Sequence, residues 1–187
     1  SPYMRHIYPV LYCQFMDTGI ADHPDLNIVG GRSFLNDSLP DDWADHHGHG
    51  THVAGIAGAR NNDNGVWGVL PGVRLFAGKV LHNDATGSSV GVARGVQWVT
   101  EFGPDLGINV INLSIGGSDG ATDALVCAAV SAAAARGMVV MSAAGNSASD
   151  LRSSCPAVCA GSLAVTAVQF SSGASKGPAI PGDFSNW

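Results

Sequence analysis

The sequence predicts an α/β fold, in which a doubly wound, mostly parallel sheet carries helices on both faces. Two observations lead to this prediction. Short apolar runs alternate with helix-like stretches along the 187 residues, and each run is apolar throughout, as in strands that are buried on both sides. In addition, 45% of the residues are hydrophobic and only 13% are charged, which supplies the side chains for a packed core.

The first half of the chain alternates between strand and helix. Residues 10–16 and 73–80 are apolar runs of strand length. Between them, residues 49–59 carry the small side chains of a closely packed helix. Residues 90–101 have apolar groups at helical spacing, and either Ser88 or Ser89 can cap this helix because a serine hydroxyl accepts from the first free amides.

The second half repeats this alternation. Residues 109–115, 138–143 and 162–168 predict strands, and residues 122–136 predict an alanine-rich helix followed by glycine, as at many helix C-termini. Residues 171–183 are rich in Gly, Ser and Pro and predict a surface loop. The sequence contains no internal repeat and no linker that would separate two domains.

Charge and hydropathy argue against two classes of partner. The formal net charge is −6, and the few Lys and Arg residues are scattered singly, so no cationic face for nucleic-acid phosphates is expected. The longest apolar stretch, residues 124–135, falls short of the ~20 apolar residues that cross a bilayer. The N-terminal residues also lack the layout of a secretory signal. We therefore expect neither nucleic acid nor membrane as a partner.

The 4 cysteines leave their pairing open. Cys13 lies in an apolar run and is expected in the core. Cys127, Cys155 and Cys159 offer no zinc-site spacing, and four cysteines allow three full connectivities, among which a sequence cannot choose. One or two buried thiols and a single disulfide are equally compatible with the pattern.

Polar groups that end predicted strands are the candidates for chemistry, because open α/β sheets bind ligands beyond the carboxyl ends of their strands. The segments of interest are Asp17-Thr18-Gly19, His49-Gly50-Thr51-His52-Val53-Ala54-Gly55, Asn112-Leu113-Ser114-Ile115-Gly116-Gly117 and Ala143-Ala144-Gly145-Asn146. Each has an ordinary interpretation: an Asp that accepts from turn amides, or an Asn in a turn. The histidines around His49 could also suggest a metal-dependent hydrolase, but no HExxH is present.

Taken together, these segments resemble the subtilisin-like serine peptidases, the subtilases. Their order, and the spacing between Asp17 and His49, are similar to those of well-known bacterial members. The resemblance runs from about residue 10 to residue 187. It implies a subtilisin-like fold, with residues 1–187 forming roughly the N-terminal two-thirds of a peptidase domain.

The resemblance implies a role for each matching residue. Asp17 would orient and stabilise the imidazole of His49, His49 would act as general base, and the Asn146 amide would stabilise the oxyanion. An extended protein or peptide substrate would lie between two strand edges and reach a specificity pocket. The residues implied for substrate binding are Ala85, Thr86 and Gly87 at one edge, Ser114, Ile115, Gly116 and Gly117 at the other, and Ala143, Ala144 and Gly145 at the pocket wall.

A structural calcium ion is also implied. The loop after the His49 helix resembles the tight calcium loop of the family and supplies hard oxygen donors. The implied ligands are the side chains of Asp25 and Asn62 and the carbonyls of Arg60, Asn64 and Val66. Residues 1–8 offer no match to the ligand that the family takes from its N-terminal segment, and a turn without an ion is the alternative.

The sequence departs from the family at the nucleophile. No Gly-Thr-Ser-Met-Ala-type string is present, and no other serine lies in a nucleophile motif. We therefore expect the nucleophile-bearing C-terminal part to be absent, the fold to be incomplete there with a bare apolar sheet face, and the chain to be inactive by itself. Gln14 is a second departure, because a buried aliphatic strand is usual at this place.

Beside a metal-dependent hydrolase, the sequence is compatible with two functions. The first is an incomplete serine endopeptidase, whose partners would include an inhibitory propeptide or a second chain that carries the serine. The second is a non-catalytic peptide-binding fragment. Secretion, the common habit of the family, and the glycosylation sequon that begins at Asn36 suggest an extracellular location.

Overall fold

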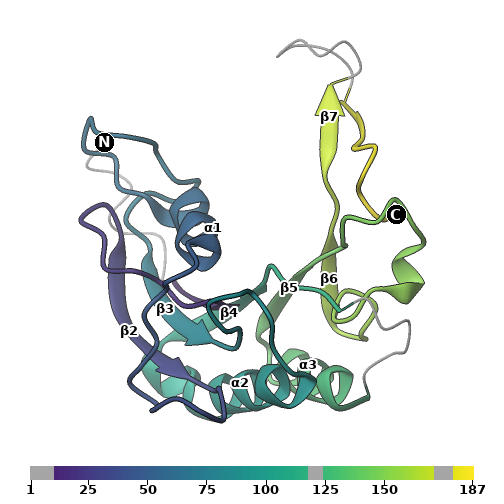
Figure 1. Cartoon of the computed structure of the whole chain (residues 1–187), viewed down its shortest axis with the longest axis horizontal. Coiled ribbons are helices and arrows are strands. Elements are labelled where there is room, and N and C mark those ends of the chain that lie inside the picture. Colours follow the sequence, from purple (N-terminus) through teal and green to yellow (C-terminus); the bar gives the residue numbers. More distant parts are fainter. Residues whose placement is uncertain (1–10, 118–123, 171–178) are drawn as a thin grey trace.

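The computed structural model describes residues 11–117, 124–170 and 179–187. A six-stranded parallel sheet forms its centre, with the strands in the order β2-β3-β1-β4-β5-β6 (Figure 1). The strands are β1 Tyr12–Asp17, β2 Asn27–Ser33, β3 Arg74–Lys79, β4 Ile108–Leu113, β5 Val139–Ala143 and β6 Ser162–Val165. A separate antiparallel pair, β7 Val168–Phe170 and β8 Ala179–Pro181, extends away from β6.

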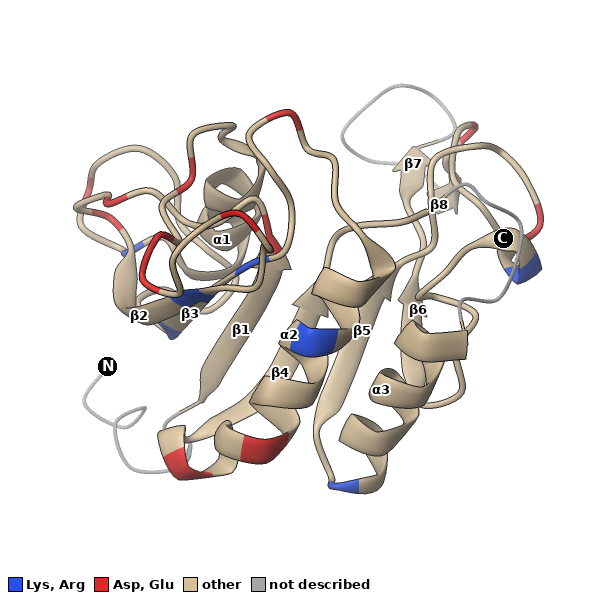
Figure 2. Ribbon diagram, turned by 60° about the horizontal axis from the view of Figure 1, so that its bottom comes forward, with Lys and Arg blue, Asp and Glu red and all other residues tan. Residues whose placement is uncertain are grey.

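Helices cover both faces of the sheet (Figure 2). α1 (His49–Gly58) packs on β1 and β3 from one side. α2 (Ser89–Phe102) packs on β1 from the other side and lies against α3 (Ala124–Ala135). The doubly wound α/β prediction is confirmed. In the part of the chain that is described, no helix has the length and apolar character needed to cross a bilayer.

The path of the chain makes β1 the point where the winding reverses. β1 pairs with β3 on one side and with β4 on the other, and all these pairs are parallel. After β1 the chain forms the edge strand β2, returns to place β3 between β2 and β1, and then crosses to β4 on the other side of β1. In open α/β sheets, ligands bind in the crevice outside the carboxyl end of the strands at such a switch point.

The observed elements follow the predicted ones with few differences. Ser88 caps α2 by accepting from the Gly91 amide at 3.1 Å, and Gly137 follows α3 with a φ of +84°. β2 was not predicted, because its two glycines and an arginine interrupt the apolar pattern of this outer strand. The predicted strand 162–168 divides into β6 and β7. The first two residues of the predicted helix 122–136 lie outside the described residues, and α3 is described from Ala124.

Apolar side chains fill both faces of the sheet beside the helices. Between the sheet and α1 lie Phe15, Leu75 and Ala77, together with Ala54 of the helix. The larger cluster on the opposite face joins the sheet to α2 and α3. Gln14 points into the protein interior on β1, where it is fully buried and its Oε1 has no hydrogen-bond partner among the described residues.

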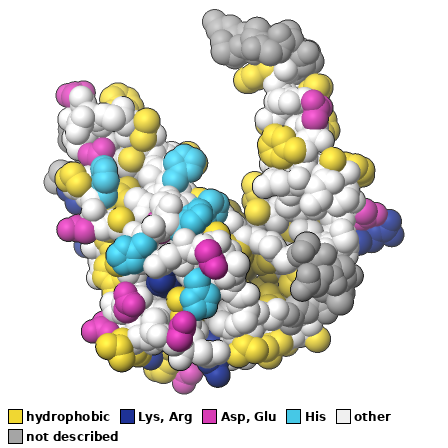
Figure 3. All heavy atoms as spheres, viewed as in Figure 1, with side chains coloured by type: hydrophobic (Ala, Val, Ile, Leu, Met, Phe, Trp, Pro, Cys, Tyr) yellow, Lys and Arg dark blue, Asp and Glu magenta, His cyan; other side chains and the backbone are white. Residues whose placement is uncertain are grey.

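On the α1 side of the sheet, the described part of the chain leaves the face of β5 and β6 exposed, as expected. The strand register places Leu163 of β6 beside Met141 of β5 and in line with Phe15, which α1 covers. Val139, Leu163 and Val165 of this face are exposed. Figure 3 shows a hollow on this side of the molecule, with apolar side chains at its base. The exposed apolar face therefore lies beyond the strands on which α1 packs.

The cysteines divide into one core residue and one cluster. Cys13 is buried in β1 as expected, and burial raises the pKa of its thiol to about 12. A disulfide joins Cys127 of α3 to Cys159 in the turn before β6. Cys155 lies in the same turn. Because Cys127–Cys159 is the one disulfide among the described residues, the alternative of a single disulfide is confirmed for them.

Candidate active site

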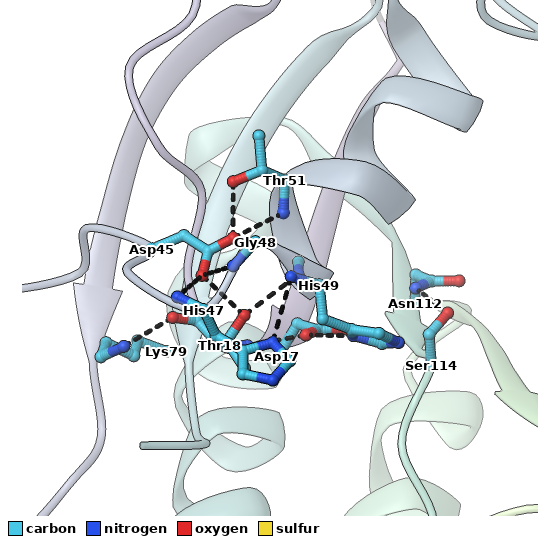
Figure 4. A network of polar contacts seen from close by, with 11 residues as sticks. Asp17, Thr18, Asp45, His47, Gly48, His49, Thr51, Lys79, Asn112 and Ser114 are labelled. Carbon is cyan, nitrogen blue, oxygen red and sulfur yellow. Dashed lines mark hydrogen bonds and ion pairs between the residues drawn. The ribbon is translucent and has the colours of Figure 1, made fainter. Parts of the chain in front are cut away.

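The centre of the candidate site is a hydrogen-bonded pair at the carboxyl end of β1 (Figure 4). Asp17, the last residue of β1, is fully buried, and its Oδ1 lies 2.7 Å from Nδ1 of His49. The same oxygen accepts from the backbone amide of Thr18 at 2.7 Å. A carboxylate can only accept, so this contact places the imidazole proton on Nδ1 and leaves Nε2 as the basic nitrogen.

His49 begins α1 and remains partly open to solvent. Its side chain is 42% exposed, whereas Asp17 is not exposed at all. The ring points from α1 toward Asn112 and Ser114 in the view of Figure 4. A buried acceptor on Nδ1 and an accessible Nε2 are the arrangement that a general base requires.

Glycine allows α1 to approach β1 closely enough for this contact. A Cβ at Gly50 would lie 2.1 Å from the carbonyl oxygen of Gly19 and 3.1 Å from Cβ of Asp17. Gly19 has a φ of +109°, and a Cβ there would lie 2.3 Å from the carbonyl oxygen of Trp43. A side chain at Gly50 would push the helix away from the strand end, so Gly50 helps to set the Asp17–His49 distance, whereas a side chain at Gly19 would displace the loop that precedes α1.

Asp45 organises the start of α1 and was not identified from the sequence. Its Oδ1 accepts from the amides of His47 and Gly48 and from the Thr18 hydroxyl, at 2.8–2.9 Å. Its Oδ2 accepts from the amide and the hydroxyl of Thr51, at 2.9 and 2.6 Å. Burial would raise the pKa of Asp45, but these hydrogen bonds, that of the Thr51 side chain above all, lower it to about 2. An acidic residue shortly before a helix N-terminus was the available sequence signal.

Thr18 connects Asp45 to the pair. Its hydroxyl donates to Asp45 and accepts from the Gly50 amide at 3.0 Å, and its carbonyl accepts from Nζ of Lys79 at 2.6 Å. Lys79 ends β3 and is buried; burial lowers the pKa of its ammonium, which the carboxylates of Asp45, Asp42 and Asp17 oppose. The strand ends and the helix start are therefore held by one polar network.

A pocket of about 340 Å³ lies beside the carboxyl ends of β4 and β5. It is lined by Ala143 and Gly145 of the predicted pocket wall, by the predicted substrate edge Ser114, Ile115, Gly116 and Gly117, and by Asn146, the residue predicted to stabilise the oxyanion. Ala144 is not among the lining residues, because it is buried and its amide donates to the carbonyl of Val165. Serines of the following loop, Ser147, Ser149, Ser153 and Ser154, and Asn186 complete the wall.

Asn186 holds the turn that carries Asn146 and was not singled out from the sequence. Its Oδ1 accepts from the amides of Ser147 and Ser149, at 2.9 and 3.2 Å. Gly145 has a φ of +106°, and a Cβ there would lie 2.5 Å from Nδ2 of Asn186. The Asn146 side chain is exposed at the pocket, on the same carboxyl edge of the parallel sheet as Asp17. Asn186 lies about 40 residues after this turn in the sequence, so no local sequence signal connects the two.

The second predicted edge, residues 85–87, forms a tight turn after β3. Ala85 has a φ of +62°, and Leu81 and Gly87 form an antiparallel bridge. The Asp84 carboxylate accepts from the hydroxyl and the amide of Thr86, which lowers its pKa. Thr86 and Gly87 line a second pocket, of about 410 Å³, which the loop of residues 35–37 borders on the other side.

The predicted calcium ligands come together in part. The buried Asp25 carboxylate lies 2.6 Å from the amide Nδ2 of Asn62, and the Asp25 carbonyl accepts from the Arg60 amide. The Asn64 amide donates to Oδ1 of Asn62 at 3.2 Å. Val66 follows on the same loop and its side chain is exposed. The carboxylate, amide and carbonyl oxygens of this loop are the donor set that Ca²⁺ prefers, so the residues fit the ion.

The histidine-rich segment forms no metal-ligand group in the part of the chain that is described. Histidine side chains gather on one wall of the hollow in Figure 3, and the rings of His47 and His49 lie 6.4 Å apart. Among the described residues, only Cys127, Cys155 and Cys159 form a group of three or more potential ligands. The geometry gives no support to a histidine-bound catalytic metal.

Comparisons with known proteins agree with this geometry. The model of the Subtilase family matches residues 14–186. Over 135 residues, the chain is 46% identical to subtilisin DY of Bacillus licheniformis, which covers 72% of this chain and 46% of that protein. Over 132 residues, it is 44% identical to subtilisin Savinase of Lederbergia lenta, with coverages of 71% and 46%. The solved structure of sphericase superposes with a TM-score of 0.82 at 29% identity and covers 95% of this chain and 59% of sphericase. The chain thus spans about half the length of the curated relatives that it matches.

Proposed function

The chain belongs to the subtilase family, and we propose that it is the Asp- and His-bearing part of a serine endopeptidase. The observation that carries the proposal is the 2.7 Å contact between Nδ1 of His49 and the buried Asp17 carboxylate. The relatives and the family model support a peptidase, and the pocket beside the strand ends supports a peptide as substrate.

In this proposal, His49 takes the proton of a serine hydroxyl through Nε2 while the serine attacks the peptide carbonyl. Asp17 keeps the proton of the ring on Nδ1 and stabilises the imidazolium that forms. His49 then gives its proton to the leaving amine. The Asn146 amide donates to the oxyanion of the tetrahedral intermediate, in which the negative charge develops.

The substrate is an extended segment of a protein or peptide. Its backbone pairs with residues 114–116 on one side and with residues 85–87 on the other, in the manner of an added strand. One side chain enters the pocket of about 340 Å³ between Gly116 and Gly145. Gly116 and Gly117 leave this entrance open because they carry no side chain.

The nucleophile is supplied by a segment with a Gly-Thr-Ser-type string, either in continuation of this sequence or in a second chain. The bare apolar face of β5 and β6 supports this arrangement, because it lies on the α1 side and offers Val139, Leu163 and Val165 for packing. By themselves, residues 1–187 are inactive in this proposal. An inhibitory propeptide is a further partner of the same cleft.

A calcium ion bound by Asp25 together with the loop of residues 60–66 is part of the proposal. Asp25 and Asn62 would offer side-chain oxygens, with the Asn62 amide turned so that Oδ1 faces the ion. Arg60, Asn64 and Val66 would offer backbone carbonyls. When bound, the ion supplies a structural cross-link of the loop and takes no part in the reaction.

The proposed location is extracellular. A disulfide such as Cys127–Cys159 persists in oxidising compartments and is rare in the cytosol. The sequon at Asn36 lies on an exposed loop between β2 and α1, where an attached glycan would find room.

A non-catalytic peptide-binding protein is the second candidate, favoured by the lack of a nucleophile string in residues 1–187. Labelling of the native protein with a fluorophosphonate separates the two functions. The endopeptidase proposal expects covalent label on one serine, and loss of the label in His49→Ala. Binding of a peptide aldehyde or substrate peptide without any labelled serine would contradict it and support the second candidate.

A further inference from the structure

Three sulfur atoms lie together where α3 meets the turn before β6. Cys127 and Cys159 form the disulfide, and Sγ of Cys155 lies 3.8 Å from Sγ of Cys159. All three sulfur atoms lie within 4.8 Å of one another. Sγ of Cys155 is therefore in direct contact with one sulfur atom of the disulfide.

We propose that these residues form a thiol–disulfide exchange site, in which Cys155 displaces Cys127 from Cys159. The Cys155 thiol loses its proton to solvent, and the thiolate attacks Sγ of Cys159. A Cys155–Cys159 bond forms as the Cys127–Cys159 bond breaks, and Cys127 leaves as a thiolate that then takes up a proton. The number of disulfides stays the same, so the step needs no oxidant or reductant.

Cys155 is better placed for this attack than Cys13. Cys13 is buried in β1, where burial raises the pKa of its thiol to about 12, so its nucleophilic thiolate is scarcely populated. Cys155 is half-buried in a turn, and it contacts the sulfur that it would attack. Both the position of Cys155 and its exposure therefore make its thiol the nucleophile in this proposal.

The two bridges would restrain different parts of the fold. The Cys127–Cys159 bridge spans 32 residues and ties α3 to the turn. A Cys155–Cys159 bridge would close only a short local loop and release α3 from the turn. Loss of the longer cross-link removes the greater restraint on the unfolded chain, so the exchanged form would be less stable.

The exchange would also act on the pocket. The Cys155 carbonyl accepts from the Gly117 amide at 3.1 Å, and Gly117, Ser153 and Ser154 line the pocket of about 340 Å³. Drawing the Cys155 side chain toward Cys159 would loosen this backbone contact. Regulation of substrate binding by this route rests on the proposed function, whereas the exchange itself does not.

Peptide mapping tests the exchange directly, because trypsin can cleave after Arg136 and Arg152 and so separates Cys127 from the other two cysteines. The whole protein is incubated at pH 8, quenched in acid, alkylated and digested. We expect a growing fraction in which Cys127 is alkylated and the peptide with Cys155 and Cys159 is unalkylated and closed internally. Absence of this fraction at every time would overturn the proposal.

Matched variants define the route. Cys155→Ser should retain only the Cys127–Cys159 bridge, and Cys13→Ala should exchange as the unchanged protein does. Cys127→Ser should form the Cys155–Cys159 bridge when treated with oxidised glutathione. If both thiols of Cys127→Ser stay open to alkylation after this treatment, the geometry does not permit the second bridge and the proposal fails.

Hydrogen exchange at the Gly117 amide tests the link to the pocket. We expect this amide to exchange about fivefold faster in oxidised Cys127→Ser than in Cys155→Ser, the change that accompanies loss of one hydrogen bond. Equal rates would remove the link. None of these measurements uses peptidase activity, so they stand whether or not fluorophosphonate labels the protein.

Discussion

Nδ1 of His49 lies 2.7 Å from Oδ1 of Asp17, although 32 residues separate the two in the sequence. Asp17 ends the strand at which the winding of the sheet reverses, and His49 begins the helix that packs on this strand. Gly50 allows the close approach because it carries no side chain, and Asp45 fixes the amides at the helix start. The pair is thus positioned by the backbone of both elements.

His49→Ala should lower kcat/KM of the complete, native enzyme by about 10³-fold or more, because it removes the imidazole that is placed to take the serine proton. Hydrolysis of a chromogenic peptide measures the loss. His52→Ala is the matched control, since this histidine is exposed one turn along the same helix, and it should retain activity. Comparable activity in both variants would refute the assigned role.

Asn146→Ala should lower kcat by about 10²-fold or more and leave KM nearly unchanged. The amide would act on the oxyanion, which exists in the transition state and not in the bound substrate. Steady-state kinetics of the complete enzyme separates the two constants. A change confined to KM would instead place Asn146 in ground-state binding.

Asp45 should make the fold sensitive to acid. Its folded-state pKa of about 2 lies below the ordinary value of 3.8, so its ionised form favours the folded state above pH 4. This stability, on the order of 1–2 kcal/mol, should disappear as the pH falls from about 4 to about 2. Urea unfolding of the 187-residue protein at several pH values measures the effect.

The control for Asp45→Asn is Asp41→Asn, because Asp41 is exposed on the same loop. The Asp45 variant should be less stable at pH 7 and should lose part of the acid dependence, whereas the Asp41 variant should follow the unchanged protein. Parallel pH curves for all three proteins would show that the hydrogen bonds of Asp45 contribute nothing measurable.

Removal of calcium should lower Tm. An ion present at about a hundred times its Kd stabilises the folded state by about 2.7 kcal/mol, which corresponds to about 5–10 °C for a chain of this size. Thermal unfolding with calcium and with a chelator tests this. Asp25→Asn should abolish the difference, and Asp63→Asn, on the same loop but outside the proposed ligand set, should preserve it.

Gln14→Met should raise the free energy of unfolding by about 1–2 kcal/mol. The side-chain oxygen Oε1 of Gln14 is buried without a hydrogen-bond partner among the described residues, which costs free energy. Methionine has a side chain of similar length and buries no such polar oxygen. Gln97→Met, at an exposed position of α2, should change the stability little. If Gln14→Met destabilises the protein, the amide has a partner that offsets its burial.

The sequence predicted an element or a site residue correctly where a residue pattern is typical of a single local structure. Continuous apolar runs predicted the buried strands, and the glycine-flanked Asp17 and His49 marked the strand end and the helix start that the fold brings together. β2 was not predicted because its glycines interrupt the apolar run that is typical of the other strands. Asp45 and Asn186 escaped for another reason: each stabilises a turn through backbone amides that become neighbours only in the folded chain.

The cysteines illustrate the same limit. Cys155 and Cys159 are closest in the sequence, yet Cys159 bonds to Cys127 because α3 brings that residue to the turn. Pairing depends on the packing of a helix on a sheet, which spacing alone does not encode. Residues that act through long-range backbone contacts are therefore the ones that the sequence leaves undetermined.

Among the described residues β6 is an edge strand of the main sheet, and its side chains Leu163 and Val165 form part of the exposed apolar face. A free strand edge beside an uncovered apolar surface is a template for self-association. Preparations of these 187 residues alone should consequently aggregate as their concentration rises, and a charged substitution such as Val165→Lys should keep them dispersed. The same surface that would receive the nucleophile-bearing segment thus governs how the isolated chain behaves in solution.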